Sequence, residues 1–122
     1  MTGTPTVESL LAEWIAAFNS HDLDRHMALY AQDAMLFGAV DELKIGRDAI
    51  RGYFGGRGPG VRVKSYPMPQ MREVAPDVVV TAGHVDFADG DEPSPYRMTW
   101  VLVRQSGNWQ IAQQHGSPRR GA

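Results

Sequence analysis

The chain has 122 residues, of which 43% are hydrophobic and 21% are charged, and its formal net charge is −2 at pH 7. This length and composition predict one globular domain, residues 1–122, with a core of its own. The small negative charge argues against nucleic acid as a main partner, and the absence of cysteine excludes disulfides and thiolate metal sites.

No segment of the sequence points to a membrane or to export. The first residues lack the basic start and the long apolar run of a signal peptide. No stretch approaches the ~18 continuous apolar residues of a membrane-spanning helix. We therefore expect a cytoplasmic protein without a membrane partner.

The chain begins with two helical patterns. Asp22 is suited to cap a short second helix that runs to about Leu29, after a first helix that ends at Asn19–His21. The first helix is predicted from apolar residues that recur at helical spacing: Val7, Leu10, Leu11, Trp14 and Phe18.

A short strand and a third helix follow. Ala34–Phe37 has the pattern of a strand, and Gly38 after it favours a bend. Arg47–Phe54 is predicted to be helical, with Asp48 in the first turn, where the helix dipole favours negative charge. Gly55–Gly60 is then expected to be a flexible turn, because it neither follows a strand nor opens a helix as a phosphate loop would.

The second half of the chain is predicted to be strands. The expected strands are Val61–Met68, Val78–Asp89, Tyr96–Gln105 and Trp109–His115. The last two strands form a hairpin that turns at Ser106–Gly107, and Asp89–Pro95 is expected to be a polar loop. Because helices come first and strands follow, the fold class predicted is α+β, with helices on one face of an antiparallel sheet.

Five stretches, taken together, resemble one superfamily. They are Trp14–Asp24, Tyr30–Ala34, Gly46–Phe54, Arg97–Ile111 and His115–Pro118. In this order and spacing they resemble the nuclear transport factor 2-like superfamily, which includes ketosteroid isomerase and the SnoaL-type polyketide cyclases. The last two stretches are similar in particular to the association domain of calcium/calmodulin-dependent kinase II and to the SgcJ/EcaC group. The resemblance implies a cone-shaped curved antiparallel sheet, packed against N-terminal helices, that dimerises sheet to sheet.

The same resemblance argues against some of the chemistry found in the superfamily. The tyrosine and two aspartates that ketosteroid isomerase uses correspond here to Trp14, to Gly38, and to Thr99 or Trp100. None of these residues is a carboxylic acid, so that isomerase reaction is not expected. Two pocket arginines of the kinase association domain correspond to Trp100 and Gly116, which argues against the same kind of anionic ligand. No cofactor motif is present, and no cofactor is expected.

The final hairpin predicts which side chains face the helices. A two-residue turn places three pairs opposite one another: Leu102 with Ile111, Trp100 with Gln113, and Met98 with His115. Since this face is the bulkier one, we expect it to pack against the helices. An error of one residue would exchange the two faces, and Arg97, Thr99 and Gln114 would then line the pocket.

The predicted site follows from this register. His115 is the candidate catalytic residue, because a histidine in a partly apolar pocket can exchange protons near neutral pH. The alternative is a histidine at a strand end with only a structural role. The candidate ligand-binding residues are Trp14, Phe18, Tyr53, Met98, Trp100 and Gln113. This lining predicts a compact apolar or aromatic ligand, with no metal.

The opposite face of the hairpin predicts self-association. It carries Thr99, Val101, Val103 and Ala112, which are too apolar for a solvated surface. A homodimer through this sheet face is therefore expected. Two functions stay open: a dimeric small-molecule-binding domain with proton transfer by His115, and a non-catalytic oligomerisation module like the kinase association domain.

Two other groups of polar residues are weaker candidates. His84 and Asp86 share a strand face, as a base with its orienting carboxylate or as a surface ion pair. A second group resembles metal ligands, although its spacing matches no known site: His21, Asp22, Asp24 and His26.

Overall fold

The computed structural model describes residues 4–120 and contains three helices and a seven-stranded sheet in that range. The helices are α1 (Thr4–Ser20), α2 (Leu23–Met27) and α3 (Arg47–Gly55). The strands are β1 (Tyr30–Phe37), β2 (Lys44–Ile45), β3 (Val61–Ser65), β4 (Gln70–Ala75), β5 (Val78–Asp89), β6 (Glu92–Gln105) and β7 (Asn108–Pro118).

The strands lie in the order β2-β1-β7-β6-β5-β3, and β4 also pairs with β5. All pairs are antiparallel except β1 with β7, which is parallel. This confirms the α+β class with a curved sheet, and corrects the expectation of a purely antiparallel one. Strand β1 comes from the helical first half of the chain. It joins the sheet beside β7, the last strand, and runs in the same direction as β7.

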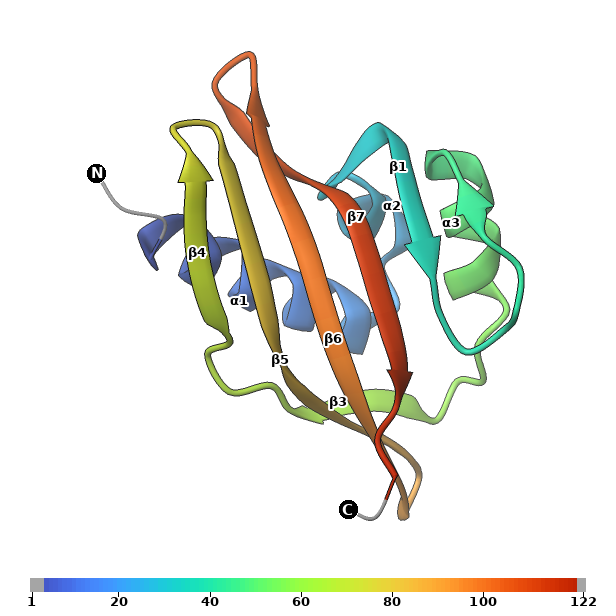
Figure 1. Cartoon of the computed structure of the whole chain (residues 1–122). Helices are drawn as coiled ribbons and strands as arrows, with labels where there is room; N and C mark the ends of the chain where they lie inside the picture. Colours follow the sequence, from blue (N-terminus) through green and yellow to red (C-terminus); the bar gives the residue numbers. More distant parts are fainter. Residues whose placement is uncertain (1–3, 121–122) are drawn as a thin grey trace.

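The helices lie together behind the curved sheet in the view of Figure 1. Helix α1 buries Val7, Trp14 and Phe18 against it, with exposures of 2% or less. Asp22 caps α2 as predicted, since its carboxylate accepts a hydrogen bond from the Arg25 N–H at 3.1 Å. Among the described residues, no helix is both long and apolar enough to cross a bilayer.

A side chain fastens the end of α1 to strand β3. The Asn19 amide donates to the Val63 carbonyl at 3.2 Å, and its Oδ1 accepts from the Val63 N–H at 2.7 Å. The side chain thereby pairs with β3 as a neighbouring strand would. This contact fixes where Phe18, the residue before Asn19, meets the sheet.

Two turns differ in how well the sequence predicts them. The turn at Ser106–Gly107 is confirmed, because Gln105 pairs with Asn108 and both central residues have positive φ, as a type I′ hairpin requires. The polar loop expected at Asp89–Pro95 is wrong. Asp89 pairs with Glu92 around a tight turn in which Gly90 has a φ of +60°. Strands β2 and β4 were not predicted, since both are short edge strands without clear alternation.

The register of the last hairpin changes halfway along it. Leu102 pairs with Ile111 as predicted, but a bulge at Ala112 adds one residue to β7. The other predicted pairs are therefore wrong: Trp100 pairs with Gln114, and Met98 pairs with Gly116. Because side chains alternate between faces, one added residue turns every later β7 side chain to the opposite face. Strand β6 keeps its predicted face.

Candidate functional site

A cavity of about 440 Å³ opens between the sheet and the ends of α1 and α3. It lies toward the β5–β6 turn, since Ala88, Asp89 and Ser94 are among its lining residues. Its polar lining comes from Tyr53, Arg57, Asp89, Ser94 and Gln114. Its apolar lining includes Phe18, Phe54, Val61, Phe87, Tyr96 and Met98. A lining of this kind suits a small, mostly apolar ligand that a few polar groups orient.

Two glycines border this cavity. A Cβ at Gly38 would overlap the Tyr53 hydroxyl oxygen, so only glycine lets this phenol pack against the end of β1. The hydroxyl there accepts a hydrogen bond from the Ala39 N–H at 2.8 Å. At Gly116 a Cβ would lie 3.4 Å from the Met98 sulfur, on the cavity wall. A larger side chain at this position would fill the cavity.

A chain of buried hydrogen bonds ends at the cavity wall. The Trp14 indole donates to the Tyr30 hydroxyl at 3.0 Å, which donates to Gln114 Oε1 at 2.5 Å. The Trp100 indole donates to the same oxygen at 3.0 Å. Gln114 is only 4% exposed, and its neighbours in this chain are fully buried. Because both indole N–H groups, the Tyr30 hydroxyl and Gln114 Oε1 have partners, this network forms a rigid wall behind the cavity.

Arg57 ties two helix ends together beside the cavity. Its guanidinium donates to the carbonyls of Phe18 at 2.6 Å and Phe54 at 3.2 Å, and its carbon lies 3.9 Å from the Phe18 ring centroid. A cation at two helix C-termini is favourable, because unpaired carbonyls point there. Partial burial lowers the pKa of Arg57 from its usual value. This residue, expected to belong only to a flexible turn, is instead part of the cavity wall.

His26 is enclosed by aromatic rings and is fully buried. Its ring lies 4.4 Å from that of Phe54 and 5.3 Å from that of Trp14, measured between centroids. Neither ring nitrogen has a hydrogen-bond partner among the described residues. Burial, and then the charge of Arg57, lower the pKa of His26 to about 3. The imidazole is therefore neutral at pH 7.

The structure brings together part of the predicted ligand site. Phe18, Tyr53 and Met98 line the cavity as expected. Trp14 and Trp100 are fully buried and belong to the wall behind it through the Gln114 network. The sequence predicts Gln114 in the pocket only in the alternative register of the last hairpin, in which the two faces are exchanged. Arg97 and Thr99, its companions in that alternative, are exposed on the outer face because β6 does not shift.

His115 and Gln113 lie on the outer face of the sheet, so their predicted place in the pocket is wrong. His115 is exposed, pairs with Phe37 of β1, and lies 5.5 Å from that ring between centroids. Gln113 is half-buried and pairs with Val101. The bulge at Ala112 is the physical cause, and the sequence carries no turn residue or proline that marks it.

The weaker candidates are dispersed by the fold. Asp24 pairs with Arg51 at 2.8 Å, and His26 is in the core away from it. In residues 4–120, no three His, Cys, Asp or Glu side chains gather as metal ligands. Asp86 forms its ion pair with Arg119, at 3.0 Å, rather than with His84.

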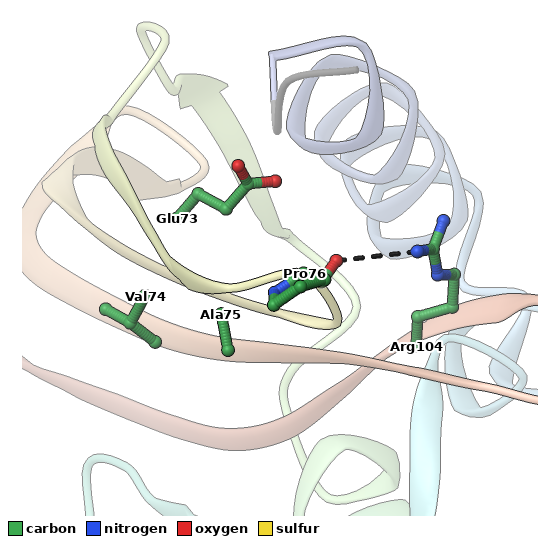
Figure 2. Close-up of a pocket in the computed structure, with 5 residues that line it drawn as sticks. All are labelled: Glu73, Val74, Ala75, Pro76 and Arg104. Atoms are coloured by element: carbon green, nitrogen blue, oxygen red, sulfur yellow. Dashed lines mark hydrogen bonds between the residues drawn. The ribbon is translucent and has the colours of Figure 1, made fainter.

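A second hollow, of about 370 Å³, lies at the turn between β4 and β5. Figure 2 shows its residues, with Arg104 reaching across to the carbonyl of Pro76. The Arg104 guanidinium also pairs with Asp77 at 2.8 Å, so its charge is already balanced. This hollow is formed mostly by an exposed turn, and we do not place the functional site there.

Comparisons with known proteins agree with this architecture. The profile of the SnoaL-like domain family matches residues 7–120. No curated protein matches the sequence significantly.

Solved structures share the fold at low sequence identity. A ketosteroid isomerase-like protein from Erwinia carotovora is 18% identical, with a TM-score of 0.82 over 95% of each chain. A Caulobacter vibrioides protein with a cystatin-like fold is 17% identical, with a TM-score of 0.84 over 98% of this chain and 91% of that one. A putative calcium/calmodulin-dependent protein kinase II association domain from Xanthomonas campestris is 25% identical, with a TM-score of 0.81 over 96% and 88%. These neighbours have the nuclear transport factor 2-like fold that the sequence motifs predict.

Proposed function

The chain belongs to the SnoaL-like domain family, and from this premise we propose that it binds a compact, mostly apolar or aromatic molecule in the cavity beside Gln114. The observation that carries the proposal is the 440 Å³ cavity, lined by aromatic rings and Met98, with a buried polar side chain in its wall. A cavity of this size accommodates a ligand of one or two fused rings.

Binding is favoured over proton transfer by a histidine. His115 lies outside the cavity, and His26 is neutral with a pKa of about 3, too low for an efficient base at neutral pH. The carboxylate that lines the cavity is that of Asp89, at its exposed rim. The residues therefore support holding and orienting a ligand.

The test uses a size series at Gly116. Thermal shift with a panel of one- and two-ring aromatic compounds should raise the melting temperature of the wild type and of Gly116→Ala, whose added methyl group makes only ordinary contacts. Gly116→Leu should fill the cavity, keep a cooperative melt and lose the ligand-induced shift. If no compound shifts the wild type, or if Gly116→Leu responds equally, ligand binding in this cavity is refuted.

A second candidate function, self-association, is supported by the outer face of the sheet. One row across five strands reads Val80, Val101, Gln113, Met35 and Ile45. Met35 is 44% exposed, Ile45 is 64% exposed, and Phe37 beside this row is 38% exposed. The 25% identical Xanthomonas protein described as an association domain adds support. We propose a homodimer through this face, which is compatible with ligand binding on the other face.

Self-association is tested by placing a charge in this row. Val101→Glu should convert a dimeric wild type to a monomer in light scattering after gel filtration, with a preserved circular dichroism spectrum. Met68→Glu, at a 45% exposed residue outside the row, is the matched control and should stay dimeric. A monomeric wild type, or a dimeric Val101→Glu, would refute this interface.

A further inference from the structure

The orientation of the Gln114 amide is fixed by its neighbours. An indole N–H can only donate, so the atom that receives the Trp100 hydrogen bond must be the amide oxygen. The Tyr30 hydroxyl already accepts from Trp14, and it directs its own proton to the same oxygen. Both donors therefore occupy Gln114 Oε1, and the NH₂ group forms the other end of the amide.

This NH₂ group has no hydrogen-bond acceptor among the residues that the structure describes. Within residues 4–120, the hydrogen bonds of the Gln114 side chain all go to Oε1, while the side chain lines the cavity. Gln114 is only 4% exposed, and its Nε2 is not among the fully enclosed polar atoms without a partner, so the surface that it keeps borders the cavity. A donor at the surface of an apolar cavity can exchange the water at this point for a ligand acceptor, which makes it the group that orients a ligand.

A second donor faces the same cavity. The Tyr53 hydroxyl accepts from the Ala39 N–H, and in the described part of the chain its own proton has no acceptor. The Arg57 cation, in contrast, directs its two terminal nitrogens at helix-end carbonyls, and its Nε is fully enclosed without a partner in the described residues, so it presents no donor to a ligand. The cavity thus offers uncharged donors within an apolar lining, which fits a neutral oxygen acceptor better than a carboxylate.

We infer that the ligand class is a compact aromatic or alicyclic ketone whose carbonyl oxygen accepts a hydrogen bond from Gln114 Nε2. This inference rests on the proposed binding function and adds the chemical group that is recognised. Gln114 acts here as a specificity-determining residue, held in one orientation by Tyr30 and Trp100.

The experiment compares two probes that differ only in the carbonyl: 1-tetralone and tetralin. Calorimetric titration of the wild type should show 1-tetralone binding about ten-fold more tightly, the usual value of one buried hydrogen bond. Gln114→Met removes the donor at similar length and should reduce this ratio to about one. Gln113→Met makes the same chemical change on the outer face and should leave the ratio unchanged.

A second variant guards against a folding defect. Gln114→Glu keeps an oxygen acceptor for Tyr30 and Trp100 but replaces the NH₂ donor, and at pH 8 it should also lose the preference for 1-tetralone.

If both probes bind the wild type equally, or if the folded Gln114 variants keep the preference, the carbonyl inference is overturned while the cavity stands. Tighter binding of 2-naphthoate than of 1-tetralone would also overturn it, in favour of anion recognition. If none of the three probes binds, the proposed function fails as well.

Discussion

The two ends of the layer between the helices and the sheet are built from similar residues but packed differently. Along the inner face of β6, Leu102 and Trp100 are fully buried in a filled core. Met98 and Tyr96, which lie two and four residues before Trp100 in the direction of the β5–β6 turn, border the cavity. Helix α1 shows the same division, with Val7 in the filled end and Phe18 at the cavity.

This comparison shows that the hollow is a property of shape rather than of composition. Gly116 withholds a side chain at the cavity wall, and Gly38 makes room for the Tyr53 ring that lines the cavity. The hydrogen-bonded chain from Trp14 to Gln114 stands at the boundary between the two ends. The filled end supplies stability, and the open end leaves apolar surface for a ligand.

The largest expected effect contrasts one truncation at each end. Leu102→Ala should lower the free energy of unfolding by about 2–5 kcal/mol, because it leaves a cavity in a filled core. Met98→Ala, on the same face of the same strand, should cost about half as much, because its side chain already borders empty space. Urea unfolding of both variants measures the difference. Equal losses would show that the two ends are packed alike.

The next effect is a pH dependence that arises at His26. Its pKa is about 3 in the folded protein and about 6.5 when unfolded, so the unfolded state binds the proton first as the pH falls. Stability is therefore complete above pH 6.5 and declines toward pH 3, by about 2–3 kcal/mol between pH 7.5 and 4.5.

The variant His26→Leu, of similar volume, should remove this contribution in urea unfolding at the two pH values. His84→Leu, at an exposed strand position, should retain the wild-type slope. An unchanged pH slope in His26→Leu would contradict a neutral, buried imidazole.

A smaller effect tests the boundary between the two ends. Tyr30→Phe leaves the Trp14 indole without its acceptor and removes one donor from Gln114, so it should cost about 1–2 kcal/mol. Tyr66→Phe is the matched control, since the Tyr66 hydroxyl is buried without a partner in the described residues. That variant should be neutral or slightly stabilising. Equal costs for the two would argue against the network.

The fold was predictable because its signals are local and repeated. The apolar spacing of α1, the Asp22 cap and the Ser106–Gly107 turn each specify one element, and all agree with the structure. The helix-then-strand order fixes the class. It does not reveal that β1 pairs in parallel with β7, since that contact joins the two halves of the chain.

The lining of the candidate site could be predicted only in part, for a physical reason. Its apolar members on α1, α3 and β6 follow from periodicity, and Phe18, Tyr53 and Met98 do line the cavity. Its polar member depends on a one-residue bulge at Ala112, which places Gln114 inside and His115 outside. The residues that follow the bulge pair with β1, which is distant in the sequence. No local residue type marks the position of the bulge.

The most direct test of the account is the response of the two neighbouring glutamine side chains of β7 to a cavity ligand. In two-dimensional ¹H–¹⁵N spectra of the wild type titrated with 1-tetralone, the NH₂ signals of Gln114 should shift and those of Gln113 should stay in place. Shifts at Gln113 and at the His115 ring, with Gln114 unaffected, would show that β7 presents its other face to the cavity and would contradict the account.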